Sequence, residues 1–115
     1  MIKRAEELQQ VEVHELRGGE GTLLKTLLGN SEETFGHASL FATFTYPPGS
    51  SIGYHTHEGE TELYYFIAGT GRVSDDGVFY DVKPGDSMCT PTGHGHGVEN
   101  TGSEDMEILA VIVLD

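Results

Sequence analysis

The sequence predicts an all-β protein with a single domain, and three observations support this prediction. The 115 residues include 16 glycines, and several turn-forming pairs divide the chain into short segments. Those segments are rich in β-branched and aromatic residues, which favour strands. The candidate helix at residues 2–10 is too weakly apolar to anchor a helical domain and could form one or two turns. Many short strands at regular spacing are typical of a β-sandwich or β-barrel.

Eight segments are expected to form strands, and turn signals separate them. Pro47-Pro48-Gly49 ends the second strand, because proline cannot continue a hydrogen-bonded ladder. Asp76-Gly77 indicates a hairpin between the fourth and fifth strands. The last segment, ILAVIVL, is apolar on both faces, so both should be covered, and in a chain this small a second subunit could supply one cover. The predicted strands are residues 22–28, 38–46, 62–68, 71–74, 78–82, 87–90, 96–100 and 108–114.

Composition and charge limit the classes of partner. A length of 115 residues fits one domain, residues 1–115, with residues 1–21 as an N-terminal arm. The formal net charge of −13 disfavours binding to nucleic acid or to an anionic membrane surface. No apolar run approaches the ~20 residues that span a bilayer. The start lacks the apolar core of a signal peptide, and the single Cys89 cannot form an internal disulfide, so we expect a cytoplasmic protein.

Histidines and a glutamate form the pattern with the clearest chemistry. His55 and His57 lie two residues apart, so on a strand both would point to one face. Gly59 allows a chain reversal that could return Glu62 to that face. About forty residues later, the segment Gly93-His94-Gly95-His96 could add another imidazole. Such a set suits Mn, Fe, Co, Ni, Cu or Zn; the alternative is that these are surface histidines in glycine-rich loops.

Two stretches of the chain resemble the two signatures of the cupin superfamily. The first signature is Gly, five residues, His-x-His, three or four residues, Glu, six residues, Gly, and residues 49–69 match it. The second is Gly, five residues, Pro-x-Gly, two residues, His, three residues, Asn, and residues 85–100 match it. The intervening residues 70–84 resemble the spacer of compact, microbial single-domain cupins. The matching positions are Gly49, His55, His57, Glu62, Gly69, Gly85, Pro91, Gly93, His96 and Asn100.

The resemblance implies a fold and a ligand set. The fold would be the cupin double-stranded β-helix, a jelly-roll barrel. One divalent transition-metal ion per chain would be held by His55, His57, Glu62 and His96. The glycines of the signatures would allow backbone turns, and Asn100 would cap one. The superfamily contains dioxygenases, decarboxylases, isomerases, epimerases, storage proteins and sensor domains, so the resemblance does not choose a reaction.

Residues outside the ligand set leave alternatives open. Tyr64 and Phe66 share the alternation of Glu62 and should face the interior. Phe66 would be a core residue, whereas Tyr64 could pack in the core or contact a substrate. His94 could be a polar group near the metal or an exposed loop residue. Tyr64 and His94 are therefore candidates for catalysis, and no catalytic residue is assigned.

Two principal functions fit this pattern. One is a metal-dependent enzyme acting on a small polar molecule, an organic acid or sugar-like carbonyl compound, as a dioxygenase, decarboxylase or isomerase. The alternative is a module that binds or senses a small ligand with the same metal site; a metal-stabilised structural protein is a third reading. We also expect a homodimer whose interface includes residues 22–28 or 108–114, the two candidate end strands.

Overall fold

The computed structural model describes all residues, 1–115, as ten strands and three short 3₁₀-helices. All the strand pairings are antiparallel. The prediction of an all-β fold is therefore confirmed. The elements are η1 (Ala5–Glu7), β1 (Gln10–His14), η2 (Leu16–Gly18), β2 (Thr22–Gly29), η3 (Glu32–Thr34), β3 (Ala38–Tyr46), β4 (Ser51–Thr56), β5 (Glu60–Ala68), β6 (Gly71–Asp75), β7 (Val78–Val82), β8 (Ser87–Thr90), β9 (Gly95–Glu99) and β10 (Met106–Leu114).

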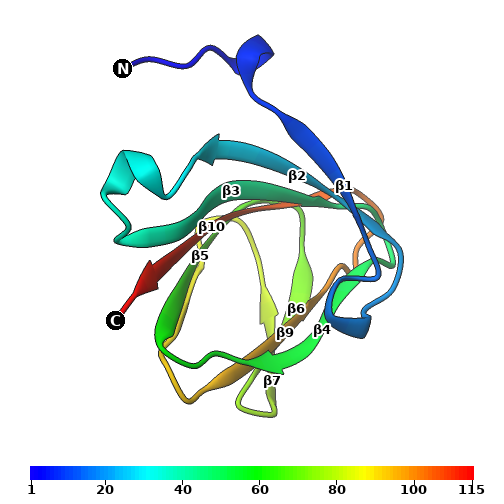
Figure 1. The fold of residues 1–115 in the computed structure, drawn as a ribbon. Coiled ribbons are helices and arrows are strands. Elements are labelled where there is room, and N and C mark those ends of the chain that lie inside the picture. The colour runs from blue at the N-terminus through cyan, green and yellow to red at the C-terminus, as the bar shows by residue number, and fades with distance from the viewer.

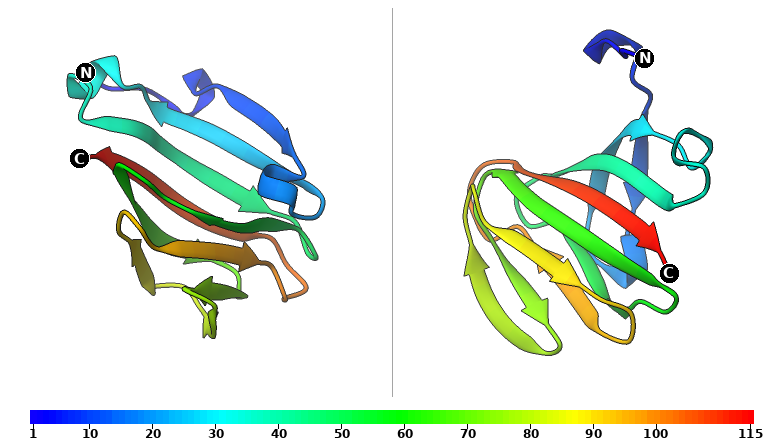
Figure 2. Two further views of the ribbon diagram at one scale, coloured as in Figure 1. Left: turned by 60° about the horizontal axis from the view of Figure 1, so that its bottom comes forward. Right: turned by 90° about the vertical axis from the view of Figure 1, so that its left-hand side faces the viewer.

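The strands form two sheets that curve around a common interior (Figure 1). The larger sheet has the order β1-β2-β3-β10-β5-β8, and the smaller has the order β4-β9-β6-β7. The N-terminal segment before β1 protrudes in the right-hand view of Figure 2, and its Lys3 pairs with Glu33 of η3. The structure has no helix with the length and apolar character that crossing a bilayer would require.

All eight predicted strands are present, with ends that shift by up to two residues, and two strands were not predicted. Strand β1 lies within the segment expected to be an N-terminal arm and pairs with β2. Its sequence, QVEVH, is short and mostly exposed, so its apolar pattern is weak. Strand β4 contains Gly53, and glycine lowers the strand signal of a six-residue segment.

The core fills the space between the two sheets with twelve buried apolar residues. Strand β5 shows how the alternation of a strand separates core from surface: Glu62, Tyr64 and Phe66 are buried, and the residues between them are exposed. The predicted inward direction of Tyr64 and Phe66 is therefore confirmed. Glu62 therefore faces the barrel interior on the same side of β5 as Tyr64 and Phe66, and it belongs to the candidate site.

Strand β10 lies at the centre of the larger sheet, between β3 and β5, and β2 lies between β1 and β3, so the expectation that these two are end strands was wrong. The chain inserts its last strand between two strands already on either side, and sequence order does not reveal such an insertion. Ile108 and Ala110 point into the core and are buried. On the outer face, Val111 lies opposite Phe41 and Leu63, both of which are substantially exposed. The second face of ILAVIVL is thus not covered within the chain.

Candidate metal centre

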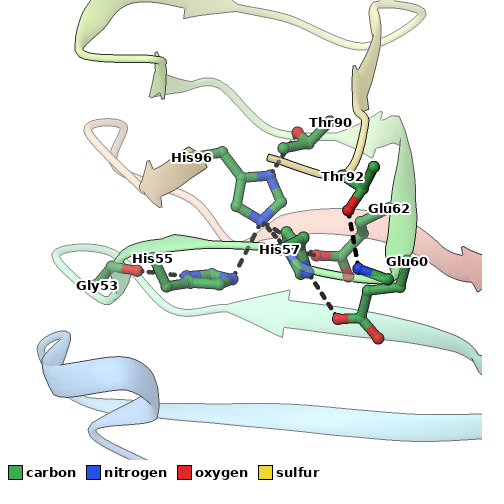
Figure 3. Close-up of polar contacts among 9 residues, drawn as sticks. Gly53, His55, His57, Glu60, Glu62, Thr90, Thr92 and His96 are labelled. Carbon is green, nitrogen blue, oxygen red and sulfur yellow. Dashed lines mark hydrogen bonds and ion pairs between the residues drawn. The ribbon is translucent and has the colours of Figure 1, made fainter. Parts of the chain in front are cut away.

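Three strands bring the histidines and the glutamate together. His55 on β4 lies directly opposite His96 on β9, which places both side chains on the inner face of the smaller sheet. His57 follows the end of β4, and the chain then reverses through Gly59, whose φ of 73° is in the left-handed region. This turn leads into β5 and returns Glu62 to the same side. Figure 3 shows the three imidazoles converging beside Glu62, as the sequence pattern predicted.

The donor atoms lie close to one another. The Nε2 atom of His96 is 3.0 Å from Nε2 of His57 and 3.2 Å from Nε2 of His55. Oε1 of Glu62 is 3.1 Å from the Nε2 atoms of both His57 and His96. All four donor atoms fall within 4.8 Å of one another, and His57, Glu62 and His96 are buried, whereas His55 is half-buried. The four residues could therefore hold one metal ion from a single side.

Each imidazole is oriented by a partner on its other nitrogen, Nδ1. The Nδ1–H of His55 donates to the carbonyl oxygen of Gly53 at 2.7 Å, and that of His57 donates to the carboxylate of Glu60 at 2.8 Å. A carbonyl and a carboxylate only accept, so these two histidines carry the proton on Nδ1. Nδ1 of His96 lies 2.8 Å from the hydroxyl of Thr90. Such partners on the outer nitrogen are the usual support of metal-binding histidines.

The resulting arrangement fits a transition-metal ion. Lone pairs on the Nε2 atoms of His55 and His57 face the same small volume as a carboxylate oxygen, and without a cation they would repel one another. Ligands about 2.1 Å from an ion and at right angles to each other are separated by about 3.0 Å, close to the Nε2–Nε2 distances here. An ion with nitrogen and oxygen ligands of this kind can act as a Lewis acid or a redox centre toward a ligand in its open positions.

Burial sets the protonation of the groups around the cluster. Burial is the main cause that lowers the pKa of His55, which favours the neutral imidazole that a metal requires. Burial, followed by the nearby Tyr46 and Glu62, raises the pKa of Tyr64 well above its usual value. Tyr64 therefore keeps its phenolic proton. Its ring stacks on the ring of His96, with 5.0 Å between centroids and 9° between planes, so it holds His96 in place as well as lining the interior.

His94 lies outside the cluster, although it was one of the two candidates for a further functional residue. Its side chain is exposed, and its Nδ1 atom pairs with the carboxylate of Asp76 in the β6–β7 turn. That carboxylate raises the pKa of His94, so the pair is a surface ion pair when the imidazole is protonated. Only the backbone of His94 reaches the site, where its carbonyl accepts the N–H of His57 at 3.1 Å.

A cavity of about 310 Å³ inside the barrel begins at Glu62 and Tyr64. It is lined largely by apolar side chains, but it also includes Arg17 and Lys25, which the sequence pattern did not single out. Lys25 alternates with Leu23 along β2, so a period-two reading of that strand could have placed it on the inner face. Arg17 belongs to η2, where no periodic signal exists. By contrast, Arg72 and Lys83 pair with surface carboxylates.

Asn100, the last fixed position of the second motif, has a structural role. Its side-chain amide donates to the carbonyl oxygens of Tyr46 and Glu104, at 2.7 Å and 2.8 Å, and its Oδ1 accepts the N–H of Gly102. The buried amide thus fixes the loop before β10 against the end of β3. The expectation that Asn100 caps a turn is confirmed.

The family described as "Cupin domain" matches residues 42–112, which contain both motifs and all four residues of the cluster. The chain belongs to the cupin family. An oxalate-binding protein from Thermotoga maritima is 42% identical over 99% of this chain and 94% of its own length. The predicted resemblance to the cupin superfamily is therefore confirmed.

Solved structures confirm the predicted jelly-roll fold of the cupin type. The crystal structure of a predicted oxalate decarboxylase from Thermotoga maritima, 42% identical in sequence, superposes with a TM-score of 0.97 over 100% of both chains. An RmlC-like cupin from Shewanella frigidimarina, 19% identical, covers 98% of this chain and 89% of its own with a TM-score of 0.77. At this lower identity the similarity concerns the fold alone.

Proposed function

We propose that this cupin holds one divalent transition-metal ion through His55, His57, Glu62 and His96 and, through that ion, binds a small carboxylate such as oxalate. The observation that carries the proposal is the convergence of four donor atoms within 4.8 Å, with Glu62 also lining the neighbouring cavity. The similarity to an oxalate-binding protein over nearly the whole chain supports the choice of ligand. In a chain with net charge −13, a metal ion would supply local positive charge for an anion.

Binding is the function that the cavity lining supports best, and turnover of the bound acid is the second candidate. The ionisable groups of the lining are Arg17, Lys25, Glu62 and two buried tyrosines. Glu62 belongs to the donor set, and the lining offers no further carboxylate or imidazole as a general base. Tyr64 could donate a hydrogen bond to a bound acid. The similarity to a predicted oxalate decarboxylase favours decarboxylation as the reaction to examine.

Calorimetric titration with oxalate tests the proposal. Protein loaded with Mn²⁺ should bind about one oxalate per chain, and chelator-treated protein should bind at least tenfold more weakly, because the ligand needs the ion. The same samples, incubated with oxalate, should be assayed for formate and carbon dioxide. Formate production would favour the enzyme, whereas binding without products would favour the binding module. Equal affinity of the loaded and metal-free protein would contradict the proposed function.

We further propose that the protein acts in the cytoplasm as a homodimer that covers the outer face of the larger sheet. Phe41, Leu63, Tyr65 and Val111 form a continuous apolar surface there across β3, β10 and β5. Exposed apolar patches of this kind are typical of interfaces. Light scattering at micromolar concentration should give the mass of two chains, and Val111→Glu should give that of one. A monomeric wild-type protein would refute the proposal.

A further inference from the structure

Two cationic side chains in the barrel cavity lack a carboxylate partner. The chain has 19 acidic residues and 6 lysines and arginines, and the cations Lys3, Arg72 and Lys83 each lie within 4 Å of a carboxylate. Arg17 and Lys25 form no ion pair and no side-chain hydrogen bond, although both line the cavity that contains Glu62; only Arg4, in the exposed N-terminal segment, is also unpaired. Arg17 is exposed and Lys25 is half-buried, so an anion in this cavity would give both cations the partner that they lack.

The local backbone holds η2, which carries Arg17, against strand β4. Arg17 has a φ of 55°, a left-handed conformation that is costly for a residue with a side chain. Its carbonyl oxygen presses against Gly53, where an added Cβ would lie only 1.9 Å away. The carbonyl of the same Gly53 accepts the Nδ1–H of His55. One glycine therefore allows η2 to lie against β4 (Figure 1) and connects the position of Arg17 with that of His55.

Arg17 enters the lining of the cavity from η2. Lys25 approaches the same cavity from β2, with its ammonium 5.8 Å from the centre of the Phe44 ring. The other lining residues include Val13, Leu16 and Ile112, whose apolar walls strengthen the field of both cations. The cavity thus has a site for a metal ion on one side and two unpaired cations on another.

We propose that Arg17 and Lys25 select dicarboxylates over monocarboxylates, with Arg17 as the residue that positions the carboxylate group not held at the metal. The inference rests on the proposed function, because it assumes that one carboxylate of the ligand binds at the metal cluster. The guanidinium presents two parallel N–H donors that match a carboxylate, whereas Lys25 supplies a point charge. A monocarboxylate leaves both cations without a partner, so its binding does not benefit from them.

The experiment compares carboxylates of different charge on Mn²⁺-loaded protein. Formate, acetate, oxalate and malonate are titrated by calorimetry into wild-type protein and the variants Arg17→Gln, Lys25→Gln and Arg72→Gln. Arg72→Gln makes the same change of charge at an exposed ion pair on the smaller sheet and serves as the control. Bound Mn²⁺ is measured for every variant, which shows that the site is folded independently of any ligand.

We expect Arg17→Gln to weaken dicarboxylate binding at least tenfold, to weaken monocarboxylate binding less than twofold, and to leave Mn²⁺ binding intact. Arg17→Lys should restore only part of the loss, and Lys25→Gln should give a smaller loss of the same kind. Equal losses for both ligand classes, or no loss relative to Arg72→Gln, would overturn the inference while leaving the proposed function standing. If loaded wild-type protein bound none of the four acids, both would fall.

Discussion

His94 and His96 stand two residues apart in one glycine-rich segment, yet they belong to different regions of the molecule. His96 is fully buried, lies opposite His55 and points its Nε2 atom at His57 and Glu62. His94 is exposed and pairs with Asp76 in a surface turn. The difference indicates that the surroundings of each ring, and not the residue type or the local sequence, decide which histidine joins the cluster.

The two rings differ in the partner of their Nδ1 atoms. Thr90 lies on the inner face of β8 and holds Nδ1 of His96, so the remaining nitrogen faces the cluster. Asp76 occupies the corresponding Nδ1 of His94 outside the barrel, and its other oxygen accepts the N–H of Gly95. The ring of Tyr54 packs over Gly95, where an added Cβ would lie 2.4 Å from the tyrosine hydroxyl. The segment is thus held from both sides, which separates the two imidazoles.

Replacing His94 and His96 in turn should give the largest difference in metal affinity between the two regions. His96→Ala should weaken Mn²⁺ or Zn²⁺ binding by more than about 100-fold, because it removes a ligand and not merely a supporting group. His94→Ala makes the same change at an exposed position and should leave the affinity within about twofold of wild type. Metal titration with a competing chelator measures both. Comparable losses in the two variants would mean that His94 also acts at the site.

Removing the hydroxyl of Thr90 tests whether this partner of His96 orients the imidazole for metal binding. Thr90→Val keeps the shape of the buried side chain and deletes the group that orients the imidazole. We expect metal affinity to fall by about 10- to 100-fold, the usual effect of losing such a partner. Thr56→Val, at an exposed position on β4, is the matched control. An unchanged affinity in Thr90→Val would indicate that the packing of Tyr64 alone orients His96.

Acid should weaken the metal site while leaving the barrel folded. Free imidazole has a pKa of about 6.5, so protons compete with the ion below that pH. Burial lowers the pKa of His55 in the folded chain, so the unfolded chain binds more protons and stability falls as pH drops through the unfolded pKa. Chelator should therefore lower the melting temperature more at pH 7 than at pH 5. An equal shift at both pH values would show that the ligands are not titrating imidazoles.

The sequence predicted the cluster better than the cavity beside it, for a physical reason. The spacing of His55, His57, Glu62 and His96 depends on local alternation, one turn and one strand pairing, which a motif records. Arg17 lines the cavity from η2, which packs against Gly53 of β4, a contact between segments more than thirty residues apart. The central position of β10 likewise depends on strands far away in the chain. Such long-range pairings leave little trace in local patterns.

The most direct test of the central claim is elemental analysis of purified protein. Wild-type protein should contain about one transition-metal ion per chain, whereas the double variant His55→Ala/His57→Ala should contain almost none. Circular dichroism should show the same strand content in both, because the apolar core does not depend on the cluster. Full metal content in a folded double variant would contradict the assignment of His55, His57, Glu62 and His96 as the metal site.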